Sequence, residues 1–112
     1  PQTYTLKNRK GMEAVITNYG GILMSLKVPG RTGQIDDIVL GFDKAEDYIT
    51  HKDHPYFGAL VGRYGNRIGA AQFTLDGKTH TLAANNGKNS LHGGLVGFDK
   101  KFWKGTQQGN TL

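Results

Sequence analysis

Two short segments of this sequence carry side chains suited to ligand binding and proton transfer. Asn66 and Arg67 stand beside a glycine-rich turn, and His92 stands between Leu91 and two glycines. Asparagine offers a donor and an acceptor and arginine a rigid fork of donors, so the pair suits neighbouring hydroxyls of a sugar as well as a carboxylate or phosphate. Histidine exchanges a proton near neutral pH, because its ordinary pKa is about 6.5. The candidate binding residues are therefore Asn66, Arg67 and His92, and the candidate catalytic residue is His92.

Each candidate also has a structural explanation that needs no ligand. A loop asparagine beside a solvated or internally paired arginine is ordinary, and a histidine in a turn can bond a backbone carbonyl. A phosphate-binding loop does not explain the second segment. Gly87-Lys88-Asn89 lacks a hydroxyl residue directly after the lysine, and no glycine leads it at the required spacing.

The other histidines are weaker candidates. His51 and His54 lie three residues apart with Asp53 between them, which suits two metal ligands, but a third convincing ligand is missing. We therefore expect no metal site. His80 faces Phe73 across the hairpin described below, so we expect it to pack rather than to react.

Two aromatic residues follow the second segment, Phe102 and Trp103. Either ring could stack on a sugar. Because such rings bury a large apolar surface, we expect a strand core to hold at least one of them.

The composition is that of a glycine-rich chain with a net positive charge. Glycine supplies 17 of 112 residues, about twice the usual share of roughly 7 %, and its irregular spacing indicates tight turns rather than collagen. The net charge of +5 raises the question of nucleic acid, but the basic residues are scattered, with adjacent pairs at 9–10 and 100–101. No stretch reaches the roughly 20 apolar residues of a membrane span, and the absence of cysteine excludes disulfides and thiolate metal sites. We expect a soluble protein with no nucleic-acid or membrane partner.

Strand patterns dominate the segments that must position these residues. From 22 to 28, apolar residues occupy every second position, the period of a half-buried strand. Residues 3–7 and 12–17 predict two more strands, and the apolar run 38–40 predicts a buried one. Residues 44–49 could form one helical turn at most, and no segment carries a sustained helical stripe.

A hairpin and a late turn complete the expected elements. Asp76-Gly77 suits a two-residue type I′ turn, which places Leu75 opposite Lys78 and Phe73 opposite His80. Residues 107–110 predict a turn, and residues 111–112 resemble the beginning of another strand. A domain does not normally stop there, because the partner strand would be unpaired, so we expect a truncated chain.

Several motifs occur in a characteristic order along almost the whole chain. They are TNYGG at 17–21, VLGFD at 39–43, NRI at 66–68, FTLDGK at 73–78, NSLHGG at 89–94 and GFDK at 97–100. In this order they resemble the galactose mutarotase (aldose 1-epimerase) family. The resemblance implies an all-β fold, a large antiparallel β-sandwich (the family's supersandwich) with a sugar cleft on one face. Residues 1–112 would then be the N-terminal part of a single domain whose remainder is missing.

The same resemblance implies an isomerase reaction. The α and β anomers of free hexoses such as galactose and glucose would interconvert by acid–base opening and closure of the ring, without a cofactor or metal. Arg67 would hydrogen-bond the sugar, Asn66 would be similarly placed, and His92 would be one of two active-site histidines and help to position the sugar. The family's general acid, a second histidine, and its general base, a glutamate, fall outside residues 1–112, so the isolated chain is expected to be inactive.

Three other functions stay open from the sequence. A non-catalytic carbohydrate-binding domain could use the same fold, since a fold does not fix a function. An epimerase of phosphorylated hexoses would need extra arginines for the phosphate, which the sequence does not identify. A basic nucleic-acid-binding domain would bind with a steep salt dependence. The sequence fits a cytoplasmic or an exported protein, and it predicts neither the preferred sugar nor the oligomeric state.

Overall fold

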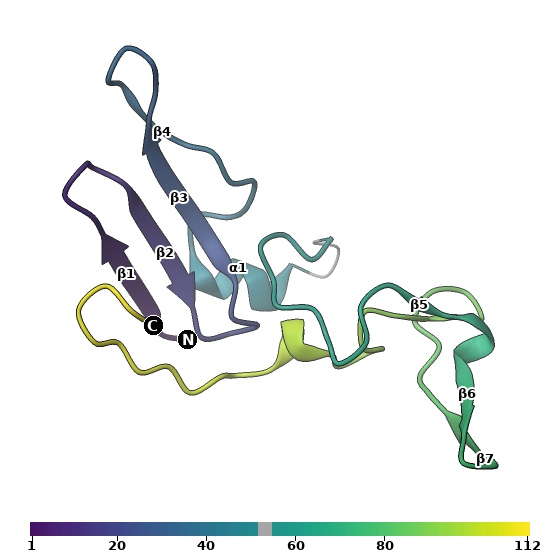
Figure 1. Cartoon of the computed structure of the whole chain (residues 1–112). Coiled ribbons are helices and arrows are strands. Elements are labelled where there is room, and N and C mark those ends of the chain that lie inside the picture. Colours follow the sequence, from purple (N-terminus) through teal and green to yellow (C-terminus); the bar gives the residue numbers. More distant parts are fainter. Residues whose placement is uncertain (52–54) are drawn as a thin grey trace.

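The computed structural model describes residues 1–51 and 55–112, and in it a four-stranded antiparallel sheet takes up the start of the chain (Figure 1). The strands lie side by side in chain order: β1 (Thr3–Lys7), β2 (Glu13–Thr17), β3 (Leu23–Pro29) and β4 (Ile35–Asp37). A bulge between Val15 and Ile16 shifts the register of β2 against β3. The alternation predicted for residues 22–28 is confirmed, because Ile22 and Met24 are buried on one face.

A short helix covers that buried face. Helix α1 (Ala45–Thr50) has six residues, more than the single turn expected, and two acidic residues in its first turn complement the helix dipole. Tyr48 on this helix is 1 % exposed and packs in one cluster with Ile22 and Met24. Its hydroxyl accepts a hydrogen bond from the backbone N–H of Phe42 at 2.9 Å. Burial, the largest cause, raises the pKa of Tyr48 above its ordinary value.

The four-stranded sheet and helix α1 form a part that we call the body, and the middle of the chain extends away from it as an arm (Figure 1, teal to green). Its elements are β5 (Arg67–Ile68), the 3₁₀ turn η1 (Gly69–Ala71), β6 (Gln72–Leu75), β7 (Lys78–Thr81) and β8 (Ser90–Leu91). A second 3₁₀ turn, η2 (Phe98–Lys100), brings the chain back to the body. The radius of gyration is 17.1 Å, whereas a compact domain of about 100 residues has roughly 13 Å. The arm therefore has little of the chain packed around it.

The hairpin at the far end of the arm confirms the sequence prediction. Strands β6 and β7 pair Leu75 with Lys78 and Phe73 with His80. Asp76 and Gly77 between them have φ of 51° and 75°, and positive φ at both central residues defines the type I′ turn.

Three glycines form a close crossing at the base of the arm, which we call the glycine seam: Gly62, Gly93 and Gly97. A Cβ on Gly93 would overlap the carbonyl oxygen of Gly62, and one on Gly97 would lie 2.5 Å from the carbonyl oxygen of His92. The Gly62 carbonyl also accepts the N–H of Phe98 at 3.2 Å. Backbone therefore packs on backbone where the outgoing and returning segments of the arm meet.

The last residues run back along the body. The Gln107 side chain donates to the Thr5 carbonyl at 2.9 Å, and the Asn110 side chain accepts the Lys7 N–H at 3.1 Å, so the two chain ends lie close together (Figure 1). The turn expected at 107–110 is confirmed by the bridge between Gln108 and Thr111.

One strand prediction is wrong. Residues 38–40 form no strand, and Ile38 and Leu40 are 62 % and 75 % exposed. The strand β4 ends just before them at Asp37, whose carboxylate accepts the N–H groups of Leu26 and Val39 at 3.0 Å each. The carboxylate takes the Leu26 N–H that the Ile38 carbonyl would accept in a continued ladder, so the pairing goes no further than the bond from the Ile38 N–H to the Leu26 carbonyl at 3.0 Å.

The expectation for the aromatic pair is also wrong. Phe102 and Trp103 lie outside the strands and are 61 % and 38 % exposed. Phe102 meets the ring of Tyr19 edge-on at 5.1 Å, and Trp103 meets Phe98 at 5.2 Å. The segment that carries them pairs its backbone with residues 18–20, through a bridge between Phe102 and Tyr19 and a bond from the Trp103 N–H to the Asn18 carbonyl at 2.7 Å, and this pairing leaves both rings partly exposed.

In residues 1–51 and 55–112, no helix has the length and apolar character needed to cross a membrane.

Candidate functional site

A two-residue ribbon brings the two sequence motifs together. Strand β5 pairs with β8, with Arg67 opposite Leu91, so Asn66 and His92 flank the same end of the ribbon. The backbone N–H of Asn66 donates to Nδ1 of His92 at 2.9 Å, and the N–H of His92 donates to the carbonyl of Asn66 at 3.0 Å. The structure therefore joins two of the three candidate residues directly.

This pairing determines the form of the His92 ring. A ring nitrogen that accepts a hydrogen bond carries no proton, so the neutral imidazole carries its proton on Nε2. Across the part of the chain that the structure describes, Nε2 makes no hydrogen bond to protein. His92 can thus offer an N–H donor to a ligand from a ring held at its other nitrogen.

His92 occupies a tight turn in an unusual conformation. The carbonyl of Leu91 accepts the N–H of Gly94 at 3.0 Å, with His92 and Gly93 between them at φ of 50° and 91°. Positive φ at both positions is again the type I′ geometry. For a residue with a Cβ, this left-handed region is sterically unfavourable.

Asn85 holds both ends of this turn. Its Oδ1 accepts the N–H of Leu91 at 2.7 Å, and its Nδ2 donates to the carbonyls of Leu91 at 2.9 Å and Gly94 at 3.2 Å. Nδ2 also lies 3.4 Å from the hydroxyl of Tyr56, whose ring meets the His92 ring edge-on at 4.8 Å. The sequence alone predicts no role for Asn85 or Tyr56. The one available signal was an asparagine pair in a glycine-rich loop, a residue type that bonds nearby backbone.

The ring of Tyr56 also lies beside a charged pair. The Lys100 ammonium lies 5.2 Å from the centroid of the Tyr56 ring and 2.6 Å from Oδ2 of Asp99. Asp99 is fully buried, and its other oxygen has no hydrogen-bond partner within the described residues.

Arg67 is positioned by a different asparagine. Its Nε donates to Oδ1 of Asn86 at 2.9 Å, and its backbone N–H donates to Oδ1 of Asn66 at 3.0 Å. The two Nη groups of Arg67 bond nothing else in the described parts of the chain, so the fork remains available to a ligand.

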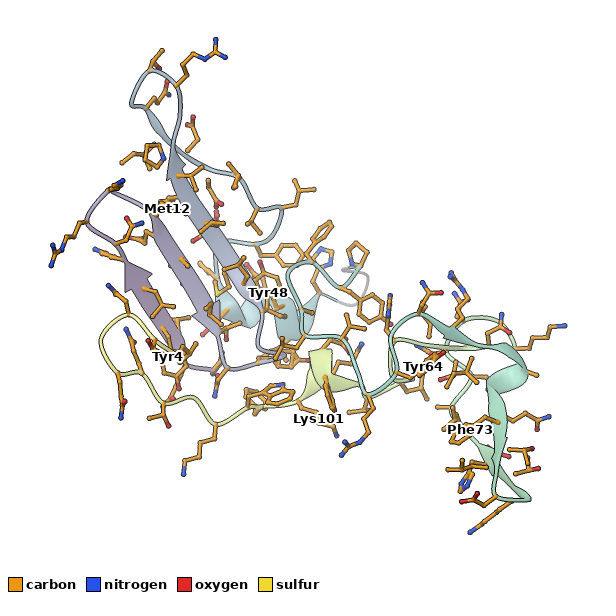
Figure 2. All side chains as sticks on the ribbon, in the orientation of Figure 1. Tyr4, Met12, Tyr48, Tyr64, Phe73 and Lys101 are labelled. Carbon is orange, nitrogen blue, oxygen red and sulfur yellow. The ribbon has the colours of Figure 1, made fainter. Side chains whose placement is uncertain are left out.

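A cavity of about 860 Å³ lies beside this ribbon. Tyr64 and Phe73 line it from the arm and Lys101 from the returning segment (Figure 2). Asn66 and Arg67 line it as well, whereas His92 does not. The cavity therefore unites two of the three predicted residues, and His92 joins them through its bonds to Asn66.

Neither of the other two described histidines, His51 and His80, lines the cavity. His80 stacks on Phe73 at 5.0 Å, which confirms the packing expectation, and His51 stacks on Phe42 at 4.8 Å. Asp53 and His54, the rest of the weak metal pattern, lie outside the described residues. The described residues contain no group of three or more His, Cys, Asp or Glu side chains that could hold a metal ion.

Comparison with known proteins assigns the chain to a family. The family described as aldose 1-epimerase matches residues 2–111. The chain belongs to the aldose 1-epimerase family. It is 53 % identical to a galactose mutarotase of Bos taurus over 79 % of this chain and 25 % of that protein. It is 39 % identical to an aldose 1-epimerase of Escherichia coli over 89 % of this chain and 28 % of that protein.

Solved structures confirm the fold. The GalM/aldose epimerase homologue from C. elegans superposes with a TM-score of 0.88 at 34 % identity, over 96 % of this chain and 32 % of that one. A galactose 1-epimerase from Lactobacillus acidophilus gives a TM-score of 0.72 at 33 % identity, over 90 % and 28 %. The expected all-β, mutarotase-like fold is therefore confirmed. The chain spans about a quarter of the length of the curated aldose 1-epimerase relatives it matches.

Proposed function

We propose that residues 1–112 are the N-terminal part of a single galactose mutarotase-like domain, and that the whole protein interconverts the α and β anomers of free hexoses such as galactose and glucose. Family membership supports the reaction class. The observation that carries the proposal to these residues is the ribbon β5–β8, which places Asn66, Arg67 and His92 around one edge.

The reaction needs two proton transfers. A base removes the proton of the C1 hydroxyl while an acid protonates the ring oxygen, the aldehyde rotates about the C1–C2 bond, and the ring closes on the other face. A positioned acid or base typically contributes about 10²–10⁴-fold to the rate. In the proposal the acid and base come from outside residues 1–112, and this chain supplies groups that hold the sugar in one orientation.

Each of the three residues has a stated task. The Nη groups of Arg67 bind neighbouring hydroxyls as a fork, with Nε held by Asn86. Asn66 presents Nδ2, because its Oδ1 already accepts the Arg67 N–H. His92 donates from Nε2, because Nδ1 accepts the Asn66 N–H.

Polarimetry tests this function. Freshly dissolved α-D-galactose is followed with the full-length protein and with its His92→Ala and His51→Ala variants. We expect rotation to change far faster than in buffer, His92→Ala to lose about tenfold to a hundredfold because a group that orients the sugar is removed, and His51→Ala to match the wild type. His51 is the matched control because it stacks on Phe42, and neither residue lines the cavity.

The same measurements can also refute the proposed enzymatic activity. Wild-type protein that changes the rotation no faster than buffer, yet binds galactose in calorimetry, would show a non-catalytic carbohydrate-binding domain on the same fold.

One observation favours a second candidate, an epimerase of phosphorylated hexoses. Arg63, which the sequence did not single out, lines the cavity together with Arg67 and Lys101, and these three cations would suit a phosphate. Parallel polarimetry with glucose and glucose 6-phosphate separates the candidates. A higher kcat/KM for the phosphate ester, lost in Arg63→Met, would support this second function.

A further inference from the structure

The conformation of His92 needs support from outside its own turn. A histidine at φ 50° is less favourable there than glycine would be, and such residues persist where surrounding contacts determine them. The backbone of the turn supplies one internal bond, from the Gly94 N–H to the Leu91 carbonyl. Other groups must therefore hold the imidazole where it meets Asn66.

Asn85 supplies the missing contacts to the backbone. One amide side chain bonds both the N–H and the carbonyl of Leu91, on one side of His92, and the carbonyl of Gly94 on the other. An asparagine has a single acceptor atom and one NH₂ group, and both are engaged with this turn. The side chain is therefore committed to the shape of the turn rather than to a ligand.

Tyr56 supplies the contact to the ring. Its edge-on packing at 4.8 Å is a favourable aromatic geometry, and it restricts rotation of the imidazole about its own side-chain bonds. The Tyr56 hydroxyl reaches back to Asn85, and the Lys100 ammonium covers the Tyr56 ring. The contacts that hold the backbone of the turn and the contact that holds the His92 ring are thus connected to each other.

We propose that Asn85 and Tyr56 are positioning residues that hold the His92 imidazole, through its turn and its ring edge, in the orientation that directs Nε2–H to the sugar. The inference rests on the proposed function, because it takes His92 as a group that contacts the substrate. Neither residue need touch the sugar itself.

The first experiment compares two asparagines that both bond backbone in a loop. Asn85→Ala and Asn8→Ala are made in the full-length protein. Asn8 accepts the N–H groups of Lys10 and Met12 in the loop between β1 and β2, on the body of the molecule. We expect Asn85→Ala to lower kcat/KM by about tenfold to a hundredfold, as supporting contacts of an active-site group do, and Asn8→Ala to stay within about twofold. Equal activity of the two variants would overturn the role of Asn85.

The second experiment uses Tyr56 and decides the question if Asn85→Ala fails to fold. Tyr56→Phe keeps the ring edge against His92, whereas Tyr56→Leu removes it. We expect Tyr56→Phe to retain kcat/KM within about threefold and Tyr56→Leu to lose about tenfold, at temperatures where circular dichroism shows both folded. Equal loss in both variants, or no loss in Tyr56→Leu, contradicts the role of the ring.

A spectroscopic readout separates this inference from the proposed function. Long-range ¹H–¹⁵N spectra of histidine-labelled protein report which ring nitrogen of His92 carries the proton, without any turnover. We expect the Nε2–H form in the wild type, a mixture in Tyr56→Leu, and the wild-type pattern in Asn8→Ala. A wild type without mutarotase activity but with this pattern refutes the enzyme and keeps the positioning, whereas an unchanged pattern in Tyr56→Leu refutes the positioning.

Discussion

The side chains of His92, Asn66 and Arg67 each bond the protein through one polar group, and within the described chain each side chain keeps another polar group unengaged. The bonded group fixes the angle of the side chain before a ligand arrives, which reduces the ordering cost of binding. For Arg67 the bonded group is Nε, an atom that lysine lacks. Charge alone would therefore not reproduce the role proposed for Arg67.

Arg67→Lys tests this point in the full-length protein. The substitution keeps the charge but loses both the bond to Asn86 and the planar fork. We expect KM for galactose to rise about tenfold, with a smaller change in kcat, because mainly binding is lost. Arg31→Lys, at an exposed turn, is the control and should leave KM unchanged. An unaltered KM in Arg67→Lys would speak against a sugar contact.

Tyr48 gives a prediction on stability against pH. Burial raises its pKa above the ordinary 10.0, since burial disfavours the phenolate. The unfolded tyrosine therefore ionises first, and the contribution of Tyr48 to stability is complete below pH 10.0 and is lost as the pH rises through the higher folded pKa. In urea unfolding from about pH 7 to about pH 11, Tyr48→Phe should show a shallower alkaline decline than the wild type.

Tyr48→Phe should also lower the stability of the protein at neutral pH. It leaves the Phe42 N–H without the hydroxyl oxygen that now accepts it, which we expect to lower the free energy of unfolding by about 1 kcal/mol. Tyr64→Phe, at a 61 % exposed side chain, is the control and should keep the wild-type alkaline decline. Identical pH profiles for all three proteins would exclude Tyr48 as the source.

At the scale of elements, the hairpin β6–β7 isolates the effect of turn conformation. A Cβ on Gly77 would meet nothing within 4 Å, yet its φ of 75° is unfavourable for alanine. We expect Gly77→Ala to destabilise the hairpin by about 1 kcal/mol, which should speed amide hydrogen exchange in its ladder by about fivefold. Gly69→Ala, with equally open space and no positive φ, should leave that exchange unchanged. Equal rates in both variants would refute the conformational explanation.

The elements that the sequence predicted well are those with local causes. The turn Asp76-Gly77 and the alternation around Ile22 depend on residues that are neighbours in the sequence, and the structure has both. The strand predicted at residues 38–40 is wrong because their apolar character suggested burial, whereas the Asp37 carboxylate takes the Leu26 N–H and the ladder ends with the bond from the Ile38 N–H to the Leu26 carbonyl. Exposure of the aromatic residues 102–103 depends on the path of a segment across the body, which no local pattern records.

Some residues of the candidate site could likewise be predicted from the sequence, and others could not. Residue type marked Asn66, Arg67 and His92, and the ribbon places all three around one edge. The sequence could not assign Asn85 and Tyr56, because their importance lies in contacts that form only when β8 turns back on β5. Their own types are equally common in loops without function.

At the scale of the whole molecule, the arm predicts how residues 1–112 behave alone. Large apolar side chains on or near it, among them Leu95 and Val96 at 62 % and 60 %, are exposed, and such surfaces mark interfaces or aggregation sites. We expect the isolated chain to bind the dye ANS, to self-associate, and to leave the rotation of α-D-galactose at the buffer rate. Turnover by this polypeptide that His92→Ala abolishes would show that it contains a complete active site.

The glycine seam has a consequence for how such a protein evolves. At Gly62, Gly93 and Gly97 almost any side chain would collide with the opposite segment or with Phe98, so these positions tolerate little change. Asn66 and Arg67 line the same cavity as these three glycines, beside a crossing whose geometry is set by backbone contacts and by the Phe98 ring. We therefore expect substitutions of the side chains that line the cavity to accumulate without altering the angle at which the arm leaves the body, so that ligand preference and shape can evolve independently.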